Sequence, residues 1–584
     1  MIVHKILELP EQAFLPIWAS LTVAFALIAP WLVGRGKVRL QRGDQASAKV
    51  AAGLWPAPRS GAWPILGVFG LIVMGYIALI FAWEDFAYYD DSQFTQYTLK
   101  GHSFRPPIWN SGRFFPLDMQ EFNLIRYLTH TAAGYHVLPA LQLLGVCALL
   151  LVLDREIDLI ARVGLAVCVL FSPGMIISFT GLIYPERNVI FWLLCLIFFV
   201  DRFDRTQSSA AAVAAVVSAQ FMLYYKETAF LLLWGFVAGR LLLRCRNIGR
   251  PGWNFGRLSE KASCLDFCLA VLGFIFVCYY GLVMHRHTSL QYAQHEKLPE
   301  LEVLLSYLKA DLLVWLFVPV VVIRFFLIFK SKIVPSPFWE SLAWGALAYV
   351  AAFLVLGMFR GYYLAPADVI AILYLGRLAC LSWGKASLSI RMAGSLLLCA
   401  ILLQNILSST YRMYERKNLI RAKVEIANRI QEQYRRNAGI PLRLYFPFSS
   451  PYLTMEFGAY LDYRGLPIEE AGTEPGGTNS VELVCHAMTN DGLIQNYRNI
   501  IGHAGRTPMP GDLVIILPDD DVSSVEASPY LYGGDSIFSY SPRPSLPGWF
   551  DFLARHLHFT YVNSFSIPDR WLNASVLLWK MKSE

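Results

Sequence analysis

The sequence predicts a polytopic α-helical membrane protein of about 12 spanning helices, followed by a small C-terminal α/β domain. Of its 584 residues, 55% are hydrophobic and only 16% are charged, whereas soluble chains carry about 25% charged residues. Near-uncharged stretches recur along residues 1–409, and the composition becomes polar after residue 409. These observations exclude a disordered protein and argue against an ordinary cytosolic enzyme.

The apolar segments approach the ~20 residues that cross a hydrocarbon core about 30 Å thick. Buried helices of a soluble core would require such uncharged stretches to recur by chance. We therefore interpret each segment as a membrane span. The predicted spans are 14–33, 62–82, 136–153, 163–181, 188–200, 209–225, 228–243, 264–284, 309–329, 339–358, 364–382 and 391–409.

Basic residues concentrate in loops that fall on one side of these spans, chiefly 34–61 and 244–261. The positive-inside rule makes that side cytoplasmic. The outer loop 83–135, the loop 285–308 and the tail 410–584 then lie outside. The net charge of +7 is therefore explained by the orientation of the chain in the membrane. It gives no reason to expect a nucleic-acid partner. The predicted location is a bacterial inner membrane, with a periplasmic or extracellular tail.

The tail predicts a separate α/β domain. After a polar helix that leaves the membrane, short β-like runs alternate with Gly, Pro, Asn and Asp turns. We expect this domain to recognise an acceptor or to support the outer loops. The predicted strands are Leu442–Phe446, Val481–Cys485, Leu513–Leu517, Leu557–Val562 and Ser575–Trp579.

The first outer loop begins with an acidic cluster directly beyond a span. Glu84, Asp85, Asp90 and Asp91 fall within eight residues, on the side where acidic charge is not needed for orientation. A carboxylate at the membrane surface acts as a general base on a hydroxyl or binds a divalent cation. If Mg²⁺ or Mn²⁺ takes part, Asp90 and Asp91 are the candidate ligands. The alternative is an ordinary solvated acidic loop.

Cations recur in the outer turns beside aromatic and acidic residues. Arginine and lysine in such turns are suited to a phosphate group. The candidates for the phosphate are Arg113, Arg187, Lys226 and Arg360. Glu84, Glu186, Glu227, Tyr363 and His285 are candidates for contacting substrate or acceptor, or for supporting the site. His285 and His287 lack a third ligand, so a metal site there is not favoured.

The membrane part, 62–409, resembles the GT-C superfamily of integral-membrane glycosyltransferases. The resemblance rests on the acidic first loop, the element Gly112-Arg-Phe-Phe-Pro, and the turns Tyr184-Pro-Glu-Arg and Tyr224-Tyr-Lys-Glu. It implies a polyprenyl-phosphate sugar as donor, interface helices in the first loop and a first-loop aspartate as general base. Here the acidic loop follows the second hydrophobic segment, whereas in many members it follows the first.

The resulting hypothesis is transfer of a sugar from a lipid-linked donor to a hydroxyl of a glycan, lipid or protein at the outer face. Direct attack would invert the anomeric centre. Asp91, Asp90 and Asp85 are the candidate bases. The alternatives are a transporter or flippase of a lipid-linked or anionic substrate, and a ligase or polymerase of lipid-linked glycans. A cavity at the outer interface would favour the transferase, and one at mid-membrane would favour transport.

Overall fold

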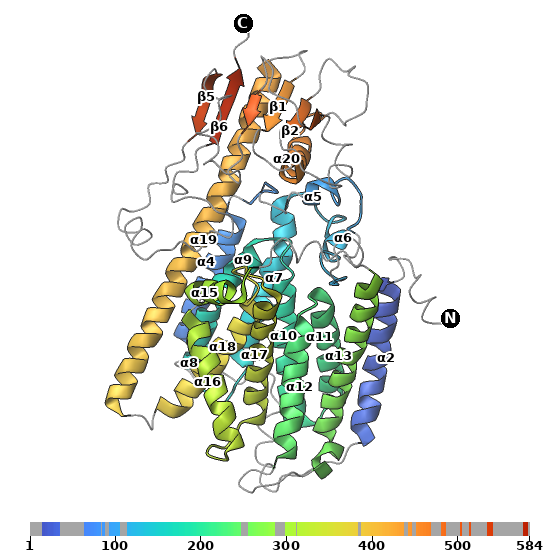
Figure 1. Ribbon diagram of the computed structural model, residues 1–584, viewed down its shortest axis with the longest axis vertical. Helices are drawn as coiled ribbons and strands as arrows, with labels where there is room; N and C mark the ends of the chain where they lie inside the picture. Colours follow the sequence, from blue (N-terminus) through green and yellow to red (C-terminus); the bar gives the residue numbers. More distant parts are fainter. Residues whose placement is uncertain are drawn as a thin grey trace. The chain divides into compact units, whose positions relative to one another are not determined.

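The computed structural model of the protein is mostly helical and describes the larger part of the chain (Figure 1). The described residues are 14–35, 63–82, 84–87, 91, 93–104, 114–246, 255–286, 298–310, 312–383, 387–436, 442–446, 451–468, 481–485, 503–504, 513–515, 534–540 and 576–581.

The chain divides into two compact units. Unit 1 comprises Met1–Ile80, Arg105–Glu121 and Val137–Thr410, and unit 2 comprises Phe81–Phe104, Phe122–His136 and Tyr411–Glu584. The division at residue 410 lies next to the boundary predicted from composition. The loop 83–135, called the first loop below, is shared: its middle segment belongs to unit 1 and its two flanking segments belong to unit 2.

Unit 1 is a helical bundle. Each predicted span coincides with a helix, although 163–181 is broken into α8 and α9, which meet at 66°. The helices are α2 (Phe14–Arg35), α4 (Trp63–Phe81), α7 (Ala132–Val152), α8 (Leu159–Leu170), α9 (Pro173–Thr180), α10 (Glu186–Thr206), α11 (Ser209–Tyr225), α12 (Ala229–Cys245), η4 (Phe255–Ser259), α13 (Lys261–Arg286), α15 (Glu300–Ala310), α16 (Leu312–Phe329), α17 (Pro337–Leu356), α18 (Ala365–Trp383) and α19 (Leu388–Arg436).

Within the described part of the chain, seven helices are long and apolar enough to cross a membrane, or eight if α8 and α9 form one span. Their outward side chains are large and apolar, such as Leu71 and Met74 on α4 and Phe274 on α13. Exposed apolar surface of this kind suits lipid. The protein is therefore a multi-pass membrane protein, and the larger count of about 12 spans remains a prediction.

Glycines bring α12 and α17 into close contact. A Cβ on Gly345 would lie 2.6 Å from the carbonyl oxygen of Leu232, and one on Gly235 would lie 2.6 Å from the Cα of Gly345. Gly239, one turn beyond Gly235, faces Ser341 in the same way. Small residues four apart let two helix backbones approach closely in a membrane, where the gain comes from van der Waals contact.

Ion pairs made by two buried arginines lie at one end of the bundle. Arg240 of α12 donates to Asp204 of α10 at 2.7 Å and to Asp266 of α13 at 2.7 Å. Arg377 of α18 pairs with Asp154 and Glu156. Charges inside a bundle are tolerated when they are paired. Because Asp204 lies near the end of α10, the start of α10 belongs to the opposite end of unit 1.

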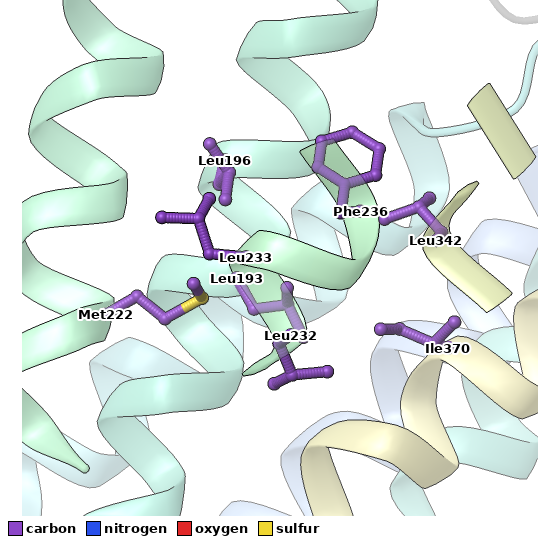
Figure 2. Close-up of a pocket in the computed structure, with 8 residues that line it drawn as sticks. All are labelled: Leu193, Leu196, Met222, Leu232, Leu233, Phe236, Leu342 and Ile370. Carbon is purple, nitrogen blue, oxygen red and sulfur yellow. The ribbon is translucent and has the colours of Figure 1, made fainter. Parts of the chain in front are cut away.

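A small cavity lies among α10, α11, α12, α17 and α18 (Figure 2). Its lining consists of hydrocarbon side chains and the thioether of Met222, among them Leu193 and Phe236. A cavity without polar partners does not hold ordered water. It likewise offers no group that would recognise a phosphate or a sugar.

Unit 2 contains the flanking segments of the first loop, with the short helices α5 (Gln93–Gln96) and α6 (Phe122–Ile125), and the polar part of α19. It also contains α20 (Pro451–Tyr463) and a sheet ordered β3-β2-β1-β4-β6-β5. The strands are β1 (Leu442–Phe446), β2 (Val481–Cys485), β3 (His503–Ala504), β4 (Leu513–Ile515), β5 (Gly534–Tyr540) and β6 (Val576–Met581).

Strands β1 to β4 pair in parallel, and β6 pairs antiparallel with β4 and β5. Helix α20 packs on β2, where Gly458 leaves room for the side chain of Leu483. The bounds of β1 and β2 are those predicted from the sequence. The predicted strand 557–562 lies outside the described residues.

Substitution of Gly345 by leucine should destabilise unit 1 by about 1–3 kcal/mol, because the new side chain meets backbone that cannot move aside. The measurement is the thermal midpoint of the purified protein. Gly70→Ala is the matched control, since a Cβ there meets no atom within 4 Å. An unchanged midpoint in Gly345→Leu would contradict the close approach.

Candidate functional site

A buried ion pair lies at the end of unit 1 where α10 begins. Lys226, directly after α11, places its Nζ 2.5 Å from Oε1 of Glu186, the first residue of α10. The two side chains are 3% and 0% exposed. Nζ also lies 4.4 Å from the centre of the Tyr363 ring, a cation–π contact. A buried charge is costly, so this lysine is held by both contacts.

Arg187 joins this pair to the middle segment of the first loop. Its Nη1 donates to the carbonyl oxygens of Gly181 and Leu182. Its Nη2 donates to Glu121 Oε1 at 3.1 Å, and the same oxygen accepts from Asn188 at 2.8 Å. Since its guanidinium is occupied by these groups, Arg187 orients Glu121.

The loop segment is also fixed by its backbone. The Leu117 N–H donates to the carbonyl oxygen of Tyr224 at 3.1 Å, in the last turn of α11. The hydroxyl of Tyr225 donates to Glu121 Oε2 at 3.4 Å. The segment is thus attached to the residues that lead into Lys226.

Asp118 is a buried carboxyl in the same segment, 5% exposed. Burial raises its pKa well above the usual range, and the nearby charges of Glu121 and Glu186 raise it further. Lys226 and Arg187 lower the pKa but do not offset these effects. Sequence reasoning missed Asp118 and Glu121, although a lone aspartate after Phe-Phe-Pro-Leu was a visible signal.

Tyr363 is another candidate of unit 1 that contacts the ion pair in the described residues, through the ring that lies 4.4 Å from Lys226 Nζ. Tyr363 is buried and stacks on Phe353, with ring centres 5.0 Å apart. Arg360 and Glu227 are half-buried. His285 lies in the last turn of α13. The structure therefore brings Glu186, Arg187, Lys226 and Tyr363 together.

Asp91 and Glu84 belong to unit 2, where they form a second charged cluster. Asp91 is 1% exposed and lies 3.0 Å from Arg416 of α19. Glu84 pairs with Lys417, lies 3.6 Å from Arg416 and faces His136 at 3.2 Å. At Glu84 and Asp91, the acidic loop is therefore buried and ion-paired with residues of α19. Arg416 and Lys417 were not singled out from the sequence, because more than 300 residues separate them from their partners.

Asp85 accepts hydrogen bonds from the hydroxyl of Tyr460 at 3.0 Å and from its neighbour's N–H, that of Phe86, at 2.7 Å. Arg464 lies 3.5 Å away. Burial raises the pKa of Asp85 despite these partners. Asp85 is thus held by Tyr460 of α20 and by Arg464, the residue directly after that helix.

Asp90 and Arg113 lie outside the described residues. The divalent-cation site predicted at Asp90 and Asp91 is therefore untested. Within the described ranges, no group of three or more His, Cys, Asp or Glu side chains is arranged to hold a metal ion.

The fold and this site define a multi-pass membrane protein with a buried charged cluster at one end of its helices. No protein-family model matches the chain, and no curated protein matches it. The chain is similar to the crystal structure of ArnT from Cupriavidus metallidurans bound to undecaprenyl phosphate. The identity is 11%, the match covers 89% of this chain and 98% of that one, and the TM-score is 0.43. At this level of similarity, the chemistry has to be inferred from the residues of this chain.

Asp118→Asn should leave the protein as stable at pH 7.5 as the wild type, or more so. The folded pKa of Asp118 is above its unfolded value, so ionisation costs stability as pH rises between the two values. Asparagine cannot ionise and removes that cost. The thermal midpoints of the two proteins should coincide near pH 4. As the pH is raised, the midpoint of Asp118→Asn should become higher than that of the wild type. A variant that is less stable at pH 7.5 would contradict the raised pKa.

Proposed function

We propose that the protein is a GT-C type glycosyltransferase that moves a sugar from a polyprenyl-phosphate donor to an acceptor hydroxyl at the outer face of the membrane. The observation that carries the proposal is the cluster of Lys226, Glu186 and the first-loop carboxyls Asp118 and Glu121. It combines a cation for a phosphate with a carboxyl for a proton, at the end of the bundle away from Arg240 and Asp204.

Lys226 and Arg360 are the proposed phosphate ligands. Arg360 is half-buried and lies three residues before Tyr363, whose ring contacts Lys226. A phosphate that reaches Lys226 would compete with Glu186 for the ammonium group. A cation placed where charge develops stabilises the departing phosphate. Arg187 acts differently, because its guanidinium already holds Glu121 and two carbonyl groups.

Asp118 is the first-loop aspartate that we propose as general base. A base works best when its pKa lies near the working pH, and burial raises the pKa of Asp118 in that direction. Asp91 is less suited, since its carboxylate is already engaged in a buried ion pair with Arg416 at 3.0 Å. The pKa of Asp85 is also raised, so Asp85 is the other first-loop aspartate to be compared with Asp118 by substitution.

The reaction balances with these groups. The acceptor oxygen forms a bond to the anomeric carbon as its proton passes to the carboxylate of Asp118. The bond from the anomeric carbon to the phosphate oxygen breaks, and its electrons remain on the lipid phosphate. Attack from the opposite face inverts the anomeric configuration. The proposed role of the tail is to recognise the acceptor or to support the first loop.

Single Asn variants at Asp118, Asp85 and Asp91 test the assignment of the base. Asp118→Asn should lower kcat by about 10²–10⁴-fold, the usual contribution of a general base. Transfer is measured from polyprenyl-phosphate donors with labelled sugars to membrane acceptors in vesicles that contain the purified protein. The kcat of the wild type should also rise with pH through the raised pKa of Asp118.

Asp462→Asn is the control, because its exposed carboxylate pairs with Lys100 in unit 2. Full activity in Asp118→Asn with loss in Asp85→Asn or Asp91→Asn would move the base to that residue. Full activity in all three variants, or no transfer from any lipid-linked donor, would refute the proposal.

A further inference from the structure

Four aromatic rings form a continuous row beside the buried ion pair. Phe353 stacks on Tyr363, Tyr363 meets Tyr362 edge to face with centres 4.9 Å apart, and Tyr362 contacts Tyr184 at 4.6 Å. The row joins the end of α17 to the residues that precede α18 and α10. Each contact is within the range of favourable aromatic pairs.

The two ends of the row differ in environment. At one end, Phe353 and Tyr363 are buried, and Tyr363 carries Lys226 on its ring. At the other end, Tyr184 and Tyr362 are half-buried, as is Arg360 two residues earlier. The function proposed above uses Lys226 and Arg360 and leaves the half-buried pair of rings unexplained.

The backbone holds both tyrosines in place. Tyr184 is two residues before Glu186, and its carbonyl oxygen accepts from the Arg187 N–H at 3.3 Å. The carbonyl oxygen of Tyr362 accepts from the Ala365 N–H at 3.1 Å. The same turns that present Glu186 and Tyr363 to Lys226 therefore present Tyr184 and Tyr362 beside them.

We propose that Tyr184 and Tyr362 are the binding surface for the pyranose ring of the donor, with its phosphate toward Lys226 and Arg360. A pyranose has one face of C–H groups, which carries a slight positive charge and fits the negative face of an aromatic ring. The hydroxyls of the tyrosines add polar groups that orient a sugar. This inference rests on the proposed function and adds the place of the sugar.

The two tyrosine rings, Tyr184 and Tyr362, are better suited to the donor sugar than to the acceptor. A glycosyl phosphate carries its anionic group directly on the ring carbon that reacts, so its sugar must lie next to the phosphate ligands. Tyr362 is adjacent in sequence and in ring contact to Tyr363, which holds Lys226. An acceptor sugar has no such requirement for a neighbouring cation.

Binding to variants at Tyr184 and Tyr362 tests the sugar surface separately from the phosphate site. The probes are undecaprenyl phosphate and undecaprenyl-phosphate glucose, galactose, mannose and N-acetylglucosamine, titrated into the full chain in nanodiscs. The wild type should bind one or more of the glycosylated probes more tightly than undecaprenyl phosphate. Tyr362→Ala and Tyr184→Ala should reduce that preference by about 5- to 10-fold while binding of undecaprenyl phosphate stays within about 2-fold.

Tyr362→Phe keeps the ring and should retain most of the preference. Tyr97→Ala is the matched control, because this exposed tyrosine belongs to unit 2. The thermal midpoint of each variant verifies folding.

Three outcomes of the binding measurements would overturn the inference. These are a wild type with no preference for any glycosylated probe, alanine variants that keep the preference, and alanine variants that lose both ligands equally. A higher acceptor KM with unchanged donor binding would assign the rings to the acceptor and also overturn it. A wild type that does not bind undecaprenyl phosphate would instead refute the phosphate site of the proposed function.

Discussion

The buried ion pair of Lys226 and Glu186 is the constraint on which the arrangement of the site depends. Burying the charge of a lysine that is only 3% exposed, at the end of an apolar helix, costs free energy. A partner of opposite charge is needed to offset that cost. Glu186 supplies that charge from the first turn of α10, and the Tyr363 ring supplies a second contact from the residues before α18. Three elements are thereby fixed around one ammonium group.

The neighbouring carboxyls follow from the same constraint. Arg187 is next to Glu186 in sequence, and its guanidinium holds Glu121, which accepts from Tyr225 beside Lys226. The middle segment of the first loop is thus attached to the pair from both sides, and it carries Asp118 with it. A carboxyl buried beside two other acidic groups has a raised pKa, the property that a base at neutral pH requires.

The positions of the apolar helices and of several tail strands could be predicted from the sequence, because hydropathy and strand alternation depend on residues that are close together in the chain. Lys226, Glu186, Arg187 and Tyr363 were already candidates from the sequence, since charge beside aromatic residues in a short turn between apolar segments is unusual. The loop carboxylates were harder. Asp91 was a candidate base, with a solvated acidic loop as the alternative, and its burial against Arg416 was not foreseen because that residue lies 325 positions later. Asp118 follows an apolar run, and the burial and neighbouring charges that raise its pKa come from the fold, which brings Glu186 beside it.

Affinity for the lipid phosphate is the most direct test of the central claim that this cluster recognises an anionic lipid. The dissociation constants of undecaprenyl phosphate and of uncharged undecaprenol are measured for the wild type and for Lys226→Met. The wild type should bind the phosphate at least about 10-fold more tightly than the alcohol, and Lys226→Met should lose most of that difference. Equal affinity for both lipids, or a full preference in Lys226→Met, would contradict the account.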